Sequence, residues 1–217
     1  MKKIIDLSTW NRREHFDFFR QLDEPFHGLV VNLDCTWAYQ HCKQENVSFF
    51  LFYLHQVLQA INATDAMRYR IEDGQIVDYN IIHASATVDR IDHTFAFCPI
   101  AYDVDFANFS LEAKQAMSNV REASGLGFNS SMMRNDVIHF SALPWISFTG
   151  LTHARHFQQE DSVPKISVGK YFKQNDRLMM PVASYVHHGL ADAYHVHQFL
   201  QTLESLLNGS QKNNYKN

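Results

Sequence analysis

Four histidines and one aspartate stand close together near the end of the chain, within the stretch YVHHGLADAYHVHQF at 185–199. Imidazole can take up or release a proton near neutral pH, and a nearby carboxylate can hold a positively charged partner. The surrounding residues are mostly apolar, and burying an ionisable group is costly unless a partner satisfies it. The pattern therefore predicts that these side chains have specific partners or a chemical task.

Two interpretations of this stretch involve no catalysis. In the first, the histidines are exposed or satisfied residues at a strand end and a helix start, but this leaves Asp192 without the cation that an inward-facing carboxylate requires. In the second, His188, Asp192 and His195 bind a metal ion, because positions i, i+4 and i+7 share one helical face. Gly189 and the strand before it place His188 ahead of the helix, which disfavours this alignment.

A third interpretation is catalytic. His188 ends a predicted strand and Asp192 opens the predicted helix that follows, which is an HxxxD arrangement. The imidazole would project into a cleft as a general base, and the aspartate would hold the turn that aims it. An aspartate in that role needs an arginine from elsewhere in the chain.

The predicted elements surround this corner without a regular βαβ rhythm. Asn11 and Glu14 have the spacing of a capping box, and Phe16 and Phe19 share a face, which predicts a helix over 11–21. Further helices are predicted at 48–63, 105–124 and 191–207, the last with Ala191, Phe199, Leu203 and Leu206 inward. Strands are predicted at 27–35, 83–89, 93–102, 136–148, 165–174 and 177–188, with a hairpin at 67–80 that turns at Asp73-Gly74.

This mixture favours an α+β fold, a two-layer mixed β-sheet packed by helices, over a doubly wound fold. The chain has 217 residues, 46% of them hydrophobic and 17 of them phenylalanine, enough for one large core. We find no linker or repeat in the sequence, so we expect a single domain over 1–208 and a frayed tail over 209–217.

Charge and composition disfavour several function classes. The net charge is −4 with neutral histidines, which argues against nucleic-acid binding. The longest apolar run, 47–61, is shorter than a membrane span and contains polar residues, and the opening segment lacks the features of a signal peptide. Three cysteines, an odd count without a CxxC pair, indicate a reduced, cytoplasmic protein.

The histidine stretch resembles the HHxxxDG signature of chloramphenicol acetyltransferases and, more distantly, the catalytic domain of dihydrolipoyl acyltransferases. The resemblance continues along the chain in the family's order. WNRREHFDFFR at 10–20 is similar to the N-terminal segment, HFSALPWISF at 139–148 to the central serine strand, ISVGKY at 166–171 to the next strand, and DRLMMPVASYVHH at 176–188 to the strand that leads into the base.

The resemblance implies a reaction and a role for each matching residue. His188 would be the base that takes the proton from a substrate hydroxyl, which attacks the thioester of acetyl-CoA directly, without a metal. Ser141 would donate a hydrogen bond to the oxyanion, although by its own surroundings it could equally be a small packed strand residue. Ser167 stands where the family often has a threonine that holds a water. Arg12 would pair with Asp192, although alone it reads as a solvated helix residue.

The resemblance also implies binding residues and departures from the family. Tyr171 would lie against the CoA adenine, and the acceptor pocket would be lined by Phe18, Phe19, Phe128 and Leu151, although phenylalanines are often plain core. Phe19 lacks the tyrosine hydroxyl that bonds the antibiotic in relatives, which is expected to cost about 1 kcal/mol. Ala193 replaces the glycine of the signature, and His139 replaces a frequent asparagine.

Several functions follow as hypotheses. The family implies a homotrimer with active sites between subunits, and an O-acetyltransferase whose acceptor is chloramphenicol or a related hydroxyl-bearing xenobiotic or metabolite. An acyltransferase with a lipoyl-type thiol acceptor is a second hypothesis. A metal-binding module built on His188, Asp192 and His195 is a third, and an inactive relative that only binds its ligand is a fourth.

Overall fold

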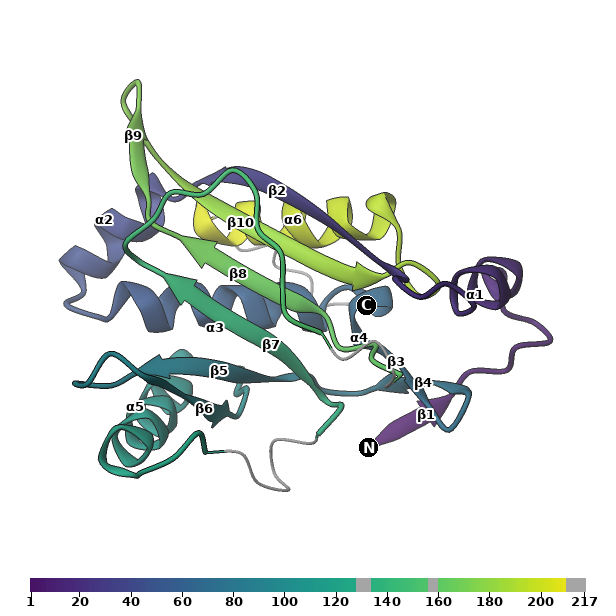
Figure 1. The fold of residues 1–217 in the computed structure, drawn as a ribbon. Helices are drawn as coiled ribbons and strands as arrows, with labels where there is room; N and C mark the ends of the chain where they lie inside the picture. Colours follow the sequence, from purple (N-terminus) through teal and green to yellow (C-terminus); the bar gives the residue numbers. More distant parts are fainter. Residues whose placement is uncertain (128–133, 156–159, 210–217) are drawn as a thin grey trace.

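A mixed β-sheet with helices on one face organises the chain in the computed structural model, which describes residues 1–127, 134–155 and 160–209 (Figure 1). Its strands follow the order β2-β10-β8-β7-β5-β6, and β9 pairs with one end of β10. These strands are β2 (Phe26–Asp34), β5 (His83–Asp89), β6 (Phe95–Ile100), β7 (Val137–Leu143), β8 (Lys165–Gly169), β9 (Phe172–Gln174) and β10 (Arg177–His187). The pairs β5–β7 and β7–β8 are parallel, and the other pairs are antiparallel.

A second, three-stranded sheet has the order β1-β4-β3 and lies near the N-terminus (Figure 1). It consists of β1 (Lys2–Ile4), β3 (Tyr69–Glu72) and β4 (Gln75–Tyr79). The β3–β4 hairpin turns at Asp73 and Gly74, whose φ angles of 50° and 73° are both positive, as a two-residue type I′ hairpin turn requires. The predicted hairpin and its turn are therefore confirmed.

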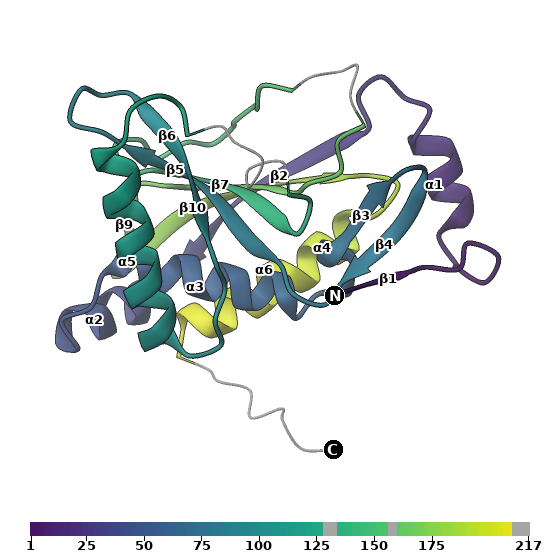
Figure 2. The same cartoon turned by 90° about the horizontal axis from the view of Figure 1, so that it is seen from below.

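The larger helices lie on one side of the seven-stranded sheet (Figure 2). The helices are α1 (Arg13–Phe19), α2 (Thr36–Gln44), α3 (Phe49–Asn62), α4 (Asp65–Arg68), α5 (Phe106–Glu122) and α6 (Ala193–Leu207). Most of α3 is buried, as expected for a helix that is apolar around most of its circumference. The Ser48 hydroxyl accepts a hydrogen bond from the Leu51 N–H and caps its start. No helix in the described part of the chain is long and apolar enough to cross a bilayer.

Alternation along the strands assigns each side chain to a face of the sheet. Phe140 on β7 and Ile166 and Val168 on β8 belong to the core beneath the helices. Their neighbours Ser141 and Ser167 therefore point to the opposite face, since successive strand residues point to opposite sides. The chain that follows β7 runs across this opposite face (Figures 1 and 2).

The predicted α+β class with a mixed sheet is confirmed, and so are most of the predicted elements. The helix predicted over 11–21 is shorter, and its capping box is wrong, because Arg12 occupies the N-cap position without a side-chain cap bond. The strand predicted over 136–148 ends at Leu143, since Pro144 has no N–H to donate to a sheet. The sequence patterns missed β1, α2 and α4.

The last helix begins two residues later than predicted. Its N-cap is Asp192, whose side chain accepts a hydrogen bond from the Tyr194 N–H, so the helix starts one residue after it. Ala191, predicted inside the helix, is buried just before it. Leu206 is only partly buried, and Leu207 is the fully buried residue of the last turn.

Candidate active site

The first part of the site is the corner where β10 ends and the chain turns into α6. The His188 N–H donates to the Pro25 carbonyl at 2.8 Å, so pairing with the segment before β2 continues one residue past the strand. The N–H groups of Leu190 and Ala191 both donate to the His187 carbonyl, which closes a tight turn. His188 thus stands ahead of the helix, as the sequence indicated.

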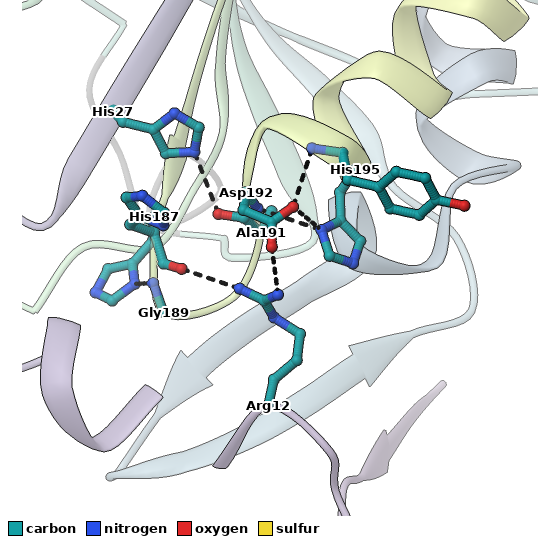
Figure 3. A network of polar contacts seen from close by, with 9 residues as sticks. Arg12, His27, His187, Gly189, Ala191, Asp192 and His195 are labelled. Carbon is teal, nitrogen blue, oxygen red and sulfur yellow. Dashed lines mark hydrogen bonds and ion pairs between the residues drawn. The ribbon is translucent and has the colours of Figure 1, made fainter. Parts of the chain in front are cut away.

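An arginine from the N-terminal segment holds this corner (Figure 3). Arg12 Nη1 donates to Asp192 Oδ2 at 2.6 Å, and Arg12 Nη2 donates to the His188 carbonyl at 3.2 Å. The Arg12 side chain is 11% exposed and that of Asp192 is 30% exposed, so the pair is partly shielded from water. The structure therefore brings together the arginine and the aspartate that the sequence paired, and one guanidinium clamps both the carboxylate and the backbone of His188.

The Asp192 carboxylate is held in its charged form. Burial alone would raise its pKa, but the hydrogen bonds from Arg12 and His195 outweigh burial and bring the pKa well below its usual range. Asp192 Oδ1 also accepts a bond from the Tyr194 N–H and lies 2.8 Å from His195 Nδ1 (Figure 3). Both carboxylate oxygens of Asp192 have partners, so Asp192 holds the turn, and His195 is one of these partners.

The His188 ring is held between two other rings. The Phe19 ring stacks on it at a centroid distance of 3.9 Å and an angle of 6°, and the His27 ring lies 4.3 Å away at 40°. Nδ1 of His188 is buried, and no described residue hydrogen bonds to it. Nε2 is neither buried nor hydrogen-bonded within the described part of the chain, so it is the nitrogen that a bound molecule can reach.

His27 is a residue of this corner that the sequence did not reveal. It pairs across β2 and β10 with Val186, which places its ring at the end of β10. The Ala191 carbonyl can only accept, so His27 Nε2 donates to it at 3.2 Å and carries the ring proton (Figure 3). Burial first, and then the nearby His188, lower the pKa of His27. The alternating pattern of 27–35 predicted a strand but gave no sign of this contact.

A second group of polar side chains lies on the face of the sheet away from the helices. Ser141 on β7 and Ser167 on β8 stand directly opposite each other in the parallel register. Thr87 Oγ1 donates to Ser141 Oγ at 3.4 Å, and Ser167 Oγ lies 3.0 Å from Nε2 of His153. Ser167 is fully buried, whereas Ser141 is half-buried. The sequence did not single out Thr87 or His153, because each belongs to the group only through strand pairing and the path of the chain after β7.

These two groups lie far apart within one chain. Ser141 is opposite Ser167, and Ser167 is opposite Ala183 on β10. His188 follows Ala183 by five residues, which is roughly 16 Å along the strand direction, and two strand spacings add roughly 10 Å across it. A base and an oxyanion donor must both lie within about 3 Å of one reacting centre. The structure therefore does not bring His188 and Ser141 of the same chain together.

The remaining predicted residues have varied surroundings. The Tyr171 ring contacts Tyr39 at 5.0 Å and Phe49 at 6.1 Å, and both partners line a cavity of about 220 Å³. Phe18 is 62% exposed, and Leu151 is half-buried. Phe128 lies outside the described residues.

Other groups with possible chemistry lie apart from the two groups. A polar cleft of about 560 Å³ lies at the β3–β4 hairpin, and its described lining includes Glu72, Arg134 and Asp136 but no residue of the two groups above. The described residues contain no group of three or more histidine, cysteine, aspartate or glutamate side chains placed to hold a metal ion. All three cysteines are free and buried, and burial raises the pKa of each thiol.

Known proteins resemble this chain along nearly its whole length. The family model described as chloramphenicol acetyltransferase matches residues 2–204. A chloramphenicol acetyltransferase of Klebsiella sp is 28% identical over 201 residues, covering 92% of this chain and 91% of that protein. Chloramphenicol acetyltransferase 3 of Escherichia coli is 26% identical over 209 residues, covering 96% and 98%.

Solved structures agree with these matches. A structure of a chloramphenicol acetyltransferase superposes with a TM-score of 0.89 at 31% identity, over 95% of this chain and 100% of that one. A probable dihydrolipoamide acetyltransferase from Listeria monocytogenes gives a TM-score of 0.68 at 16% identity, over 99% and 97%, which shows a shared fold alone. With the Arg12–Asp192 clamp behind His188 and a family match that spans the chain, the protein belongs to the chloramphenicol acetyltransferase family.

Proposed function

We propose that the protein transfers the acetyl group of acetyl-CoA to a hydroxyl of a small acceptor, with chloramphenicol as the first candidate. The observation that carries this proposal is the state of His188: its backbone is clamped by Arg12, its ring is held by Phe19, and its Nε2 is open. The relatives named for chloramphenicol supply the candidate acceptor.

In the proposed reaction His188 is the general base. A neutral imidazole takes the acceptor's hydroxyl proton at Nε2 while the oxygen attacks the thioester carbon. The tetrahedral intermediate then collapses, the C–S bond breaks, and His188 returns the proton to the leaving CoA sulfur. The products are the acetyl ester and free CoA, and no acyl-enzyme forms. Holding both substrates side by side supplies much of the rate.

The oxyanion of the intermediate needs a donor, and Ser141 is our candidate. Its half-buried hydroxyl faces the side of the sheet away from the helices. A single well-aimed donor contributes about 3 kcal/mol to the stability of such a transition state. Ser167, next to it in the register, is expected to orient a water near the same oxygen.

We further propose that the site forms between two copies of the chain, as in a homotrimer. The separation of His188 and Ser141 supports this, since one chain cannot supply both groups to one carbonyl. Trp145 and Ile146, both more than half exposed, provide apolar surface for such a contact.

Binding sites for the two substrates follow from the same proposal. The CoA adenine is assigned to Tyr171, beside the 220 Å³ cavity lined by Tyr39 and Phe49. The acceptor is assigned to a pocket that includes Phe18, Phe19, Phe128 and Leu151. We also propose that residues 1–208 act as one domain and that the protein works in the cytoplasm, where its three buried thiols would stay reduced.

The test measures CoA release from acetyl-CoA with a thiol-trapping dye, using purified protein and chloramphenicol. We expect His188→Ala to lower kcat at least a thousandfold, because the base is lost. His197→Ala, an exposed histidine on α6, should keep the wild-type rate. Equal activity of His188→Ala and wild type would overturn the base assignment.

The choice of acceptor separates the second hypothesis from the first. A panel of hydroxylated antibiotics and metabolites is compared with dihydrolipoamide in the same assay, read as acetyl ester or thioester by mass. Activity with the thiol but with no alcohol would replace the O-acetyltransferase by a dihydrolipoyl-type acyltransferase.

A further inference from the structure

His153 lies beside the proposed oxyanion group although no resemblance points to it. Its Nε2 is 3.0 Å from Ser167 Oγ, and Ser167 is fully buried opposite Ser141. No other hydrogen bond to the Ser167 hydroxyl is found among the described residues. His153 is therefore the side chain that fixes the direction of this hydroxyl.

The position of the ring proton follows from the second nitrogen of His153. Nδ1 is buried, and no described residue hydrogen bonds to it. A buried N–H without an acceptor is rarer and costlier than an unpaired lone pair, so the proton belongs on Nε2. Burial first, and then Lys165, lower the pKa of His153, which keeps the ring neutral near pH 7. His153 thus donates to Ser167 Oγ.

This direction of donation determines what Ser167 can do. Because Ser167 Oγ accepts from His153, its own proton is free for another acceptor, and since Ser167 is fully buried that acceptor must be small, such as an enclosed water. Ser141 shows the same arrangement, since its oxygen accepts from Thr87 Oγ1 at 3.4 Å. Each serine oxygen thus receives one hydrogen bond, which leaves the serine's own proton for another acceptor.

The His153 ring is also fixed in position. The Tyr185 ring packs against it edge to face, with centroids 4.9 Å apart at 79°. Tyr185 in turn lies over Gly28 on β2, where a Cβ atom would stand 2.5 Å from the tyrosine ring. A side chain at position 28 would displace Tyr185, so the glycine leaves room for the ring that supports His153.

We propose that His153 is a positioning residue for acetyl transfer, which acts by holding the Ser167 hydroxyl with its proton directed at a water that in turn binds the oxyanion. The proposal rests on the proposed O-acetyltransferase function. It adds a histidine from the chain after β7 to a group otherwise built from strand residues.

The test is a double-mutant cycle on the full chain with chloramphenicol, or with the best acceptor from the panel. His153→Leu removes the donor, and we expect kcat to fall about tenfold with the KM for acetyl-CoA unchanged. Ser167→Ala should lower kcat by about the same factor. The kcat of the double variant should also be lowered about tenfold rather than a hundredfold, because both substitutions remove the same interaction.

A conservative variant separates positioning from folding. His153→Gln places an amide N–H near the original Nε2 and should keep kcat within about threefold of wild type. His197→Leu, an exposed histidine, is the matched control. A hundredfold loss in the double variant, wild-type kcat in His153→Leu, or no advantage of Gln over Leu would each overturn the role of His153 while leaving the transferase intact. Absence of CoA release by the wild type with every alcohol would overturn the proposed function and this inference with it.

Discussion

Arg12 and Asp192 are 180 residues apart in sequence, yet Arg12 Nη1 donates to Asp192 Oδ2 at 2.6 Å. The same guanidinium reaches the carbonyl of His188, so the N-terminal segment and the turn after β10 behave as one unit. A planar guanidinium with several fixed donors suits this double task better than a lysine ammonium would. The orientation of the proposed base thus depends on a residue from the other end of the chain.

Breaking this pair is expected to affect both stability and activity. Arg12→Ala should lower the free energy of unfolding by about 2 kcal/mol, because it leaves a partly buried carboxylate without its cation. It should also lower kcat at least tenfold, since the turn that carries His188 loses its clamp. Urea unfolding and initial rates measure the two effects.

The neighbouring arginine provides the control. Arg13 is 61% exposed and makes a surface pair with Asp17 at 3.6 Å. Arg13→Ala should change stability by less than about 0.5 kcal/mol. If both alanine variants behave alike, the clamp does not have the role assigned to it.

The free energy of unfolding should decrease as the pH falls, partly because of His139. Burial, and next the charge of Lys165, lower the pKa of His139 to about 4, whereas an unfolded histidine has a pKa of about 6.5. Below about pH 6.5 the unfolded chain therefore binds a proton that the folded protein refuses, and stability is lost as the pH falls toward 4. His139→Asn removes this contribution.

Denaturant unfolding at pH 7 and pH 5 measures the contribution of His139 to the free energy of unfolding. Between these values the stability of the wild type relative to His139→Asn should drop by about 2 kcal/mol. His197→Asn, at an exposed position, should follow the wild type at both pH values. A constant difference between wild type and His139→Asn would show that His139 is not the group responsible.

A shared site predicts that two inactive variants restore activity together. Ser141→Ala lacks the proposed oxyanion donor and His188→Ala lacks the proposed base, so each alone should be nearly inactive. When equal amounts are unfolded and refolded together, one interface in four combines an intact His188 with an intact Ser141, which gives about a quarter of wild-type activity. Mixing the same variants without refolding is the control, and a site within one chain would yield no recovery in either case.

Phe19 allows the stacking contact to be separated from acceptor binding. Phe19→Tyr keeps the ring on His188 and adds the hydroxyl that the family resemblance implies at this position, so the KM for chloramphenicol should fall about fivefold with kcat unchanged. Phe19→Leu removes the stacked ring and should lower kcat severalfold. Steady-state kinetics on both variants check this, and equal kinetics for Tyr and Leu would exclude a role for the stack.

Local patterns in the sequence were sufficient for most of the elements. Period-two alternation predicted β5 with its observed bounds, and Asp73-Gly74 predicted the hairpin turn, because strand alternation and turn conformation depend on near neighbours. The predicted capping box at Asn11 is wrong because this helix start depends on a distant residue rather than on near neighbours. Arg12 occupies the N-cap position and uses its side chain for Asp192, a contact with a residue that no local pattern includes.

The sequence by itself determined the order of most of the elements, the α+β class, and, through the resemblance, the set that includes Arg12, Ser141 and His188. Only the tertiary structure decided which of these meet. Strand register places Ser141 beside Ser167 but far from His188. The pairing of β2 with β10 brings His27 to His188, and the path of the chain after β7 brings His153 to Ser167. The physical reason is that strand register and the path of the chain over the sheet are set by packing across the whole sheet, whereas a sequence pattern depends only on the few residues around each position.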